Sequence, residues 1–119
     1  MWQNAIYPED KTARYEMMAR QLAALLDGER ESIPNLANMS ALIFDALEDL
    51  NWAGFYLMEN GMLVLGPFQG KPACIEVPVG KGVCGTAVQK AETILVEDVH
   101  QEHLVMELEV VVAALLLVF

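Results

Sequence analysis

Hydrophobic residues recur at helical spacing through the first fifty positions of the chain. The first such stretch covers residues 8–27 and stops before Gly28, a residue type that commonly follows the end of a helix. Its apolar face consists of Tyr15, Met18, Leu22, Leu25 and Leu26. The second stretch covers residues 34–50, and its apolar stripe consists of Leu36, Met39, Ile43, Leu47 and Leu50. We therefore expect two amphipathic helices, each with one face toward a core.

The pattern changes after Asn51, where short apolar runs replace the helical spacing. Residues 52–58, WAGFYLM, are rich in aromatic side chains and form a run too short for a helix, which favours a strand. The pair Asn60-Gly61 follows, and this pair is a strong signal for a two-residue hairpin turn. Residues 62–68, MLVLGPF, then return as the second strand of the hairpin.

Further short elements follow the hairpin. Residues 74–79 and 93–99 are predicted to be strands. Between them, the Gly-rich residues 80–85 predict a turn and residues 86–90 a short helix. Two helices followed by a mainly antiparallel sheet define an α+β fold.

The last segment, residues 101–119, departs from this pattern. Leu104, Leu108 and Val111 keep a helical spacing, but residues 110–119 are apolar on every side. A membrane-spanning helix needs roughly 20 residues, about twice the length of this run. The run must be buried, pair with another chain or lower the solubility. We therefore expect a homodimer sealed through residues 110–119, or a poorly soluble monomer.

Charge narrows the range of partners. The 119 residues are enough for one domain and include 17 acidic and 7 basic side chains, which give a net charge of -10. The basic residues form no cluster, which disfavours both nucleic acid and anionic membranes as partners. The N-terminus shows no secretory signal, so we expect a cytoplasmic protein. Two cysteines in a reducing compartment are not expected to form a permanent disulfide.

The two cysteines lie on either side of the Gly-rich turn, in KPACIEVPVGKGVCGTA. Cys84 at the entry to a short helix, with Lys81 nearby, could be held as a thiolate. Cys74 could meet Cys84 across the turn and form a reversible disulfide. Both cysteines could instead be small buried hydrophobic residues, and the spacing of the two cysteines alone favours this interpretation.

Other candidate sites are weaker. Trp52, Phe55 and Tyr56 could form the wall of a small pocket, although ordinary core packing explains them more simply. The glycines lack the spacing and the terminal Lys-Ser/Thr of a phosphate-binding loop. We expect no metal, because no paired Cys-x-x-Cys unit is present and His100 and His103 are typical of a solvated surface.

Four motifs together resemble one family: NLANMSALIFDAL, NWAGFYL, LVLGPFQGKPACIEVPVGKGVCGTA and VEDVH. They are similar to the free methionine-(R)-sulfoxide reductases, and the match runs over residues 35–100. The resemblance implies a single GAF domain over residues 1–119. It also implies a central antiparallel sheet, with the N-terminal helices packed on one side and a small enclosed pocket.

The resemblance also implies a reaction. A cysteine attacks the sulfoxide sulfur of free methionine-(R)-sulfoxide and becomes a sulfenic acid, and a second cysteine condenses with it to a disulfide. Thioredoxin, which receives its electrons from NADPH, then reduces the disulfide, so no bound cofactor is expected. By position, Cys74 matches the principal resolving cysteine and Cys84 an auxiliary one, while Trp52 and Tyr56 match aromatic residues that line the substrate pocket.

The resemblance ends after His100. The family carries its nucleophilic cysteine in a GHIACD segment and holds the substrate amino group with later SEIV and DID acidic residues, none of which is present here. The domain is therefore expected to be incomplete over residues 101–119, with an exposed sheet edge and impaired activity. A deletion would make this segment the family's closing helix, whereas a frameshift would replace the native end. A non-catalytic small-ligand sensor is the alternative function.

Overall fold

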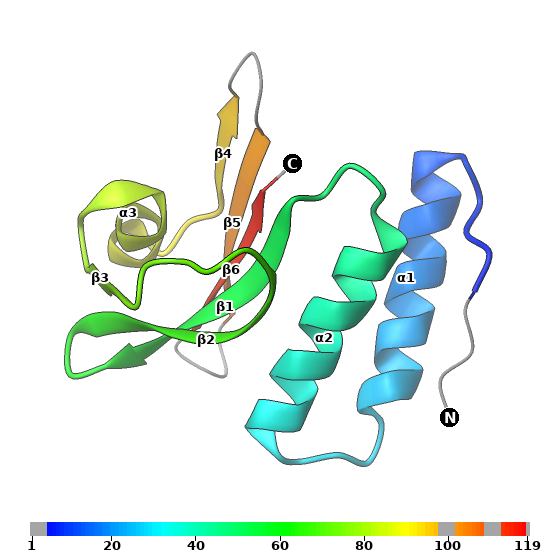
Figure 1. Ribbon diagram of the computed structural model, residues 1–119, viewed down its shortest axis with the longest axis horizontal. Coiled ribbons are helices and arrows are strands. Elements are labelled where there is room, and N and C mark those ends of the chain that lie inside the picture. The colour runs from blue at the N-terminus through cyan, green and yellow to red at the C-terminus, as the bar shows by residue number, and fades with distance from the viewer. Residues whose placement is uncertain (1–4, 98–101, 109–112, 119) are drawn as a thin grey trace.

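The computed structural model describes residues 5–97, 102–108 and 113–118, and the side chains of residues 5–96. Three helices are seen there (Figure 1), namely α1 (Lys11–Leu26), α2 (Ser32–Ala46) and α3 (Gly82–Lys90). The strands are β1 (Trp52–Glu59), β2 (Met62–Gly70), β3 (Glu76–Pro78), β4 (Ile94–Glu97), β5 (Glu102–Leu108) and β6 (Ala113–Val118).

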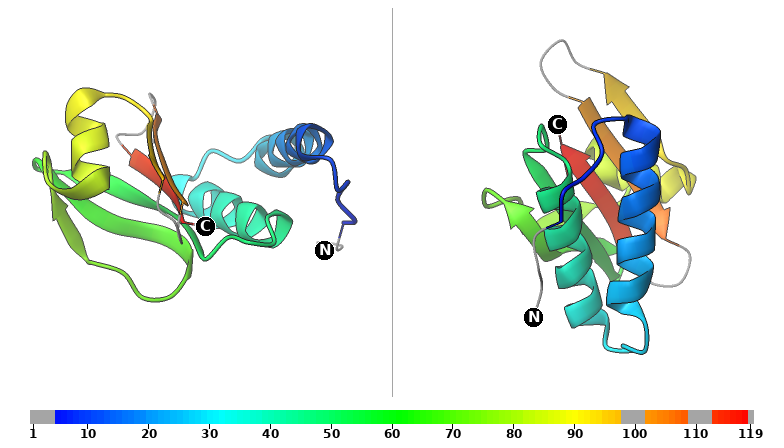
Figure 2. Two further views of the ribbon diagram at one scale, coloured as in Figure 1. Left: turned by 90° about the horizontal axis from the view of Figure 1, so that it is seen from above. Right: turned by 90° about the vertical axis from the view of Figure 1, so that its right-hand side faces the viewer.

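The strands form one antiparallel sheet in the order β3-β2-β1-β6-β5-β4. Helix α2 packs on one face of this sheet and α1 lies outside α2, whereas α3 covers the opposite face (Figure 2). The α+β class and the placement of the N-terminal helices on one side are therefore confirmed.

The two N-terminal helices begin and end close to the predicted positions. Asp10 caps α1, because its carboxylate accepts a hydrogen bond of 2.9 Å from the Ala13 N–H. Helix α2 ends at Ala46, four residues before the predicted end at position 50. Leu47 and Leu50 are nevertheless buried, because the chain turns toward β1 while both side chains stay in the core.

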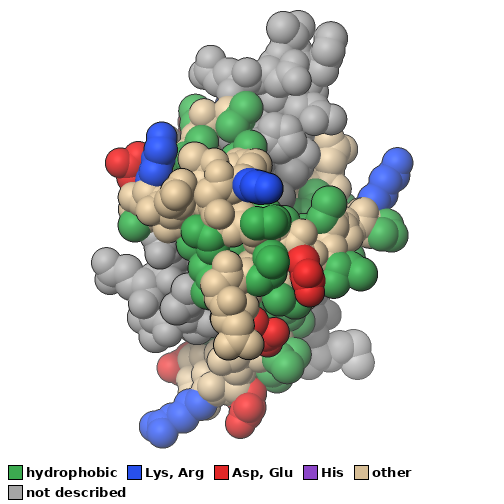
Figure 3. Space-filling view, turned by 90° about the vertical axis from the view of Figure 1, so that its left-hand side faces the viewer, with side chains coloured by type: hydrophobic (Ala, Val, Ile, Leu, Met, Phe, Trp, Pro, Cys, Tyr) green, Lys and Arg blue, Asp and Glu red, His purple; other side chains and the backbone are tan. Residues whose placement is uncertain are grey.

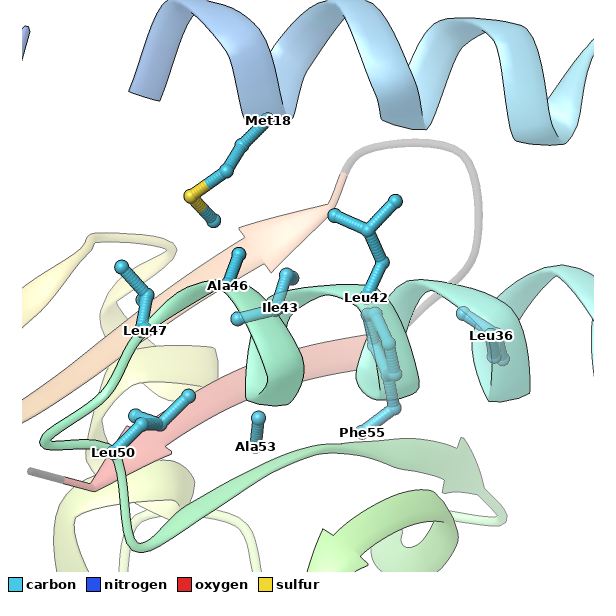
Figure 4. Packing of buried hydrophobic residues seen from close by; sticks show 9 residues of the cluster. All are labelled: Met18, Leu36, Leu42, Ile43, Ala46, Leu47, Leu50, Ala53 and Phe55. Atoms are coloured by element: carbon cyan, nitrogen blue, oxygen red, sulfur yellow. The ribbon is translucent and has the colours of Figure 1, made fainter. Parts of the chain in front are cut away.

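Strand β1 is buried on both faces, which explains its nearly continuous apolar sequence. Ala53 and Phe55 point toward the helices and belong to the α2-side cluster shown in Figure 4. The other face of β1 contributes Trp52 and Tyr56 to a second cluster. We call this second group the α3-side cluster, and its buried members are Trp52, Tyr56, Leu63, Cys84 and Ala87.

The hairpin between β1 and β2 is confirmed in detail. Asn60 and Gly61 both have positive φ, at 50° and 78°, as a two-residue hairpin turn of this type requires. Further along the pair, the register shifts between Gly54 and Tyr56, so β2 carries a bulge that accommodates Pro67. The buried Ser40 hydroxyl donates to the carbonyl groups of Leu36 and Pro67 and so ties α2 to the bulge.

The C-terminal segment forms strands, so the closing helix that the deletion account implied for it is wrong. Strand β6 pairs with β1 on one side and with β5 on the other, which fills the sheet edge that was expected to be open. The unpaired N–H and C=O groups of β1 favour an extended neighbour over a helix, because a strand can satisfy all of them. Residues 109–112 and 119 lie outside the described part of the chain.

Candidate functional site

The glycines around Cys84 shape the start of α3. Gly80 and Gly82 have φ values of 87° and 67°, a conformation that glycine adopts without strain and that forms a turn at the start of the predicted Gly-rich segment. A side chain at Gly85 would place its Cβ 2.3 Å from the carbonyl oxygen of Pro78. The absence of a side chain thus lets α3 lie against the end of β3, and it brings Cys84 to the sheet.

Helix α3 begins at Gly82 rather than at the predicted position 86, so Cys84 lies inside its first turn. The Cys84 side chain is only 7% exposed and packs in the α3-side cluster. Burial raises the pKa of the Cys84 thiol to about 11, although a hydrogen bond from its own backbone N–H acts in the opposite direction. The suggestion that the helix start holds Cys84 as a thiolate is therefore wrong, because burial outweighs it.

Cys74 differs from Cys84 in its surroundings. It lies two residues before β3, and its side chain is exposed. Its backbone is fixed, because the Cys74 carbonyl accepts a hydrogen bond of 2.9 Å from the Tyr56 hydroxyl. The neighbouring Ile75 carbonyl accepts another of 2.8 Å from the Leu65 N–H. Both cysteines are free thiols, one on the surface and one in the core.

Tyr56 connects the two cysteines. Burial is the main cause of its raised pKa, and negative charge on Cys84 and then on Cys74 would raise it further. The structure brings Tyr56, Cys84 and the backbone of Cys74 together.

Trp52 contacts the other end of the segment that runs from Lys71 to Cys74. Its ring stacks on Phe68 at a centroid distance of 5.3 Å and on Tyr56 at 6.1 Å. The indole N–H donates a hydrogen bond of 3.1 Å to the Lys71 carbonyl. Sequence reasoning missed Phe68, and the signal that could have found it is its position in GPFQGKPAC, three residues before Lys71.

The face that carries α3 and β3 exposes hydrophobic side chains near its centre and charged groups toward its margins (Figure 3). Ile75, which follows Cys74, is 72% exposed. A hollow of about 370 Å³ lies elsewhere, and its lining includes Tyr7, Arg14, Asp45 and Glu48 but no member of the α3-side cluster.

Within the described ranges, no three His, Cys, Asp or Glu side chains lie close enough to share a metal ion. His100 and the side chain of His103 lie outside these ranges. The helices seen in the described part of the chain include none long and apolar enough to cross a membrane.

The fold and the comparisons define this chain as a GAF domain. It superposes on a solved GAF domain with a TM-score of 0.88 and 32% identity, over 97% of this chain and 78% of the other. A solved free methionine-R-sulfoxide reductase of Staphylococcus aureus is 39% identical with a TM-score of 0.83, over 97% of this chain and 82% of that chain. The chain therefore belongs to the free methionine-R-sulfoxide reductase family.

Sequence comparison agrees with this family. The free methionine-R-sulfoxide reductase of Escherichia coli is 54% identical over 91 residues, which are 76% of this chain and 55% of that protein. The chain thus spans about half the length of the curated relatives it matches. A scan against protein-family models found no match. The structural match covers more of the chain than the sequence match does, so the likeness in backbone extends beyond the likeness in sequence.

Proposed function

We propose that this chain binds free methionine-R-sulfoxide beside the α3-side cluster and reduces it by cysteine chemistry. The observation that carries the proposal is the position of Tyr56, which packs with Cys84 in that cluster and also binds the backbone of Cys74. Support comes from the S. aureus relative, whose structure was also solved in complex with its substrate. Trp52 and Tyr56 would provide the aromatic wall of the substrate pocket.

Cys74 is the cysteine that we expect to attack, in place of the resolving role that the resemblance implies for it. Cys84 is protonated at neutral pH because burial raises its pKa to about 11, whereas Cys74 is exposed. The Cys74 thiolate attacks the sulfoxide sulfur while the sulfoxide oxygen takes up a proton. The oxygen then passes to the cysteine sulfur as the new S–S bond breaks, so Cys74 becomes a sulfenic acid and methionine leaves as the thioether. The Cys84 thiol then condenses with this sulfenic acid, which releases water and forms a disulfide.

Thioredoxin would close the cycle. Its dithiol gives two electrons and two protons to the Cys74–Cys84 disulfide and becomes a disulfide itself, and NADPH restores it through thioredoxin reductase. The domain itself then needs no bound cofactor, and the reaction would take place in the cytoplasm. Turnover should be slow, because the sequence has no counterpart of the family's GHIACD segment.

The test follows NADPH consumption in the presence of thioredoxin, thioredoxin reductase and free methionine-R-sulfoxide. We expect consumption by the parent chain, none by Cys74→Ser, and a single reduction per molecule without efficient recycling by Cys84→Ser. Methionine-S-sulfoxide serves as the substrate control. Unchanged consumption by Cys74→Ser would refute the proposed role of this residue.

A ligand sensor without catalysis is the second candidate. The protonated, buried state of Cys84 favours it, because a pocket that lacks a thiolate in its wall can bind methionine without reacting. Calorimetry distinguishes the two functions. Binding of methionine or its sulfoxide that is weakened by Trp52→Ala, together with no NADPH consumption, would support the sensor.

A further inference from the structure

Two hydrogen bonds hold the segment from Lys71 to Cys74 at its two ends. The Trp52 indole N–H donates to the Lys71 carbonyl at 3.1 Å, and the Tyr56 hydroxyl donates to the Cys74 carbonyl at 2.9 Å. Both donors come from one face of β1, because residues two and four apart on a strand share a face. Neither end of the segment can move without breaking one of these bonds.

The donors are themselves rigid. Trp52 and Tyr56 are 7% and 3% exposed, and their rings stack with an interplanar angle of 24°. Gly54 lies between them, and a Cβ there would be 2.2 Å from the Cβ of Phe68. This position must therefore be glycine for Phe68 to stack on Trp52. The aromatic side chains are fixed by packing before they receive the segment.

This arrangement determines how Cys74 can approach Cys84. The Cys74 backbone is attached to a ring that packs in the same cluster as Cys84, although the Cys74 side chain is exposed. Negative charge on Cys84, and then on Cys74, would also raise the pKa of the Tyr56 hydroxyl. The backbone of Cys74 is therefore tethered to the cluster that contains Cys84, so the two cysteines are not joined by a free loop alone.

We propose that Trp52 and Tyr56 are positioning residues for thiol–disulfide exchange, and that their two hydrogen bonds keep Cys74 at a high effective concentration beside Cys84. This role is distinct from contact with substrate and rests on the cysteine pair of the proposed function. In a glutathione buffer, the two thiols pass two electrons and two protons to glutathione disulfide. The products are the Cys74–Cys84 disulfide and two glutathione molecules.

The experiment measures this equilibrium without methionine sulfoxide. The parent chain, Tyr56→Phe and Trp52→Phe are each equilibrated over a series of glutathione ratios, trapped by alkylation and quantified by mass spectrometry. Both variants keep an aromatic ring. Tyr56→Phe loses only the hydroxyl donor, whereas Trp52→Phe loses the indole N–H donor together with the second ring of the indole. One hydrogen bond is worth a factor of about two to ten, so we expect each variant to lower the effective concentration of the thiols by that factor.

Tyr7→Phe is the matched control, because the Tyr7 hydroxyl also donates a hydrogen bond, to Gln21 in α1. We expect this variant to leave the thiol equilibrium unchanged. Three outcomes would each overturn the inference. They are an equal effect of Tyr7→Phe and Tyr56→Phe, an unchanged effective concentration in both Tyr56→Phe and Trp52→Phe, and a parent chain that forms no Cys74–Cys84 disulfide. A measured shift without NADPH consumption would uphold it while the proposed function fails.

Discussion

Cys84 occupies the first turn of α3, where free backbone N–H groups favour negative charge, yet the apolar cluster around it favours the neutral thiol. The second effect is larger, since the pKa rises to about 11. The thiolate fraction should therefore increase about tenfold for each pH unit between 7 and 9. We predict the same increase in the rate of iodoacetamide labelling of Cys84, measured by mass spectrometry in the Cys74→Ser variant.

The control for this labelling is the same variant unfolded in urea, where Cys84 should titrate near its ordinary pKa of about 8.5. The labelling rate of the unfolded variant should then begin to level off between pH 7 and 9. A plateau in the folded protein below pH 9 would contradict the effect of burial.

Gly85 is a second position where one residue decides the local structure. We predict that Gly85→Ala lowers the free energy of unfolding by about 2 kcal/mol or more, because its Cβ would overlap the Pro78 carbonyl oxygen at 2.3 Å. Gly28→Ala is the control, since Gly28 has a φ of 77° but open space around it. It should cost about 1 kcal/mol, from backbone strain alone. Urea denaturation followed by circular dichroism measures both, and equal losses would contradict the steric argument.

At the scale of elements, α3 ends on a residue that is poorly suited to its conformation. Ala91 has a φ of 52°, and the N–H groups of Ala91 and Glu92 close the helix end through the Val88 and Ala87 carbonyls. We predict that Ala91→Gly stabilises the domain by about 1 kcal/mol, because glycine adopts this conformation without strain.

The control for this helix end is Ala19→Gly in the exposed middle of α1, which should destabilise the domain by about 0.5 to 1 kcal/mol. Thermal melting of the two variants beside the parent chain measures both changes. Shifts of the melting temperature with the same sign in both variants would contradict the claim that Ala91 is strained in its conformation.

At the scale of the whole molecule, the pairing of β6 with β1 removes one reason to expect association, namely an open sheet edge. The apolar residues 110–119 remain, so the homodimer stays a prediction. Size-exclusion chromatography with light scattering should give twice the mass of one chain. Neighbouring strand residues point to opposite faces, so we offer two variants, Leu116→Lys and Leu117→Lys. One of them should shift the measured mass toward that of the monomer. A monodisperse monomer of the parent chain would contradict the dimer.

The sequence by itself determined the local elements of this protein. The spacing of Leu36, Ile43 and their neighbours specified an amphipathic helix, and Asn60-Gly61 specified the hairpin, because both signals depend on residues close in the chain. The motif around Cys74 and Cys84 also indicated the family, since its residues are contiguous in the chain.

Only the tertiary structure decided the rest. Residues 113–118 are apolar enough for a helix or a strand, and the free edge of β1 selected the strand. Likewise, Cys84 and Cys74 differ little in sequence context, but the α3-side cluster encloses one and leaves the other exposed. Strand pairing and desolvation depend on residues far apart in the chain, so a local pattern does not contain them.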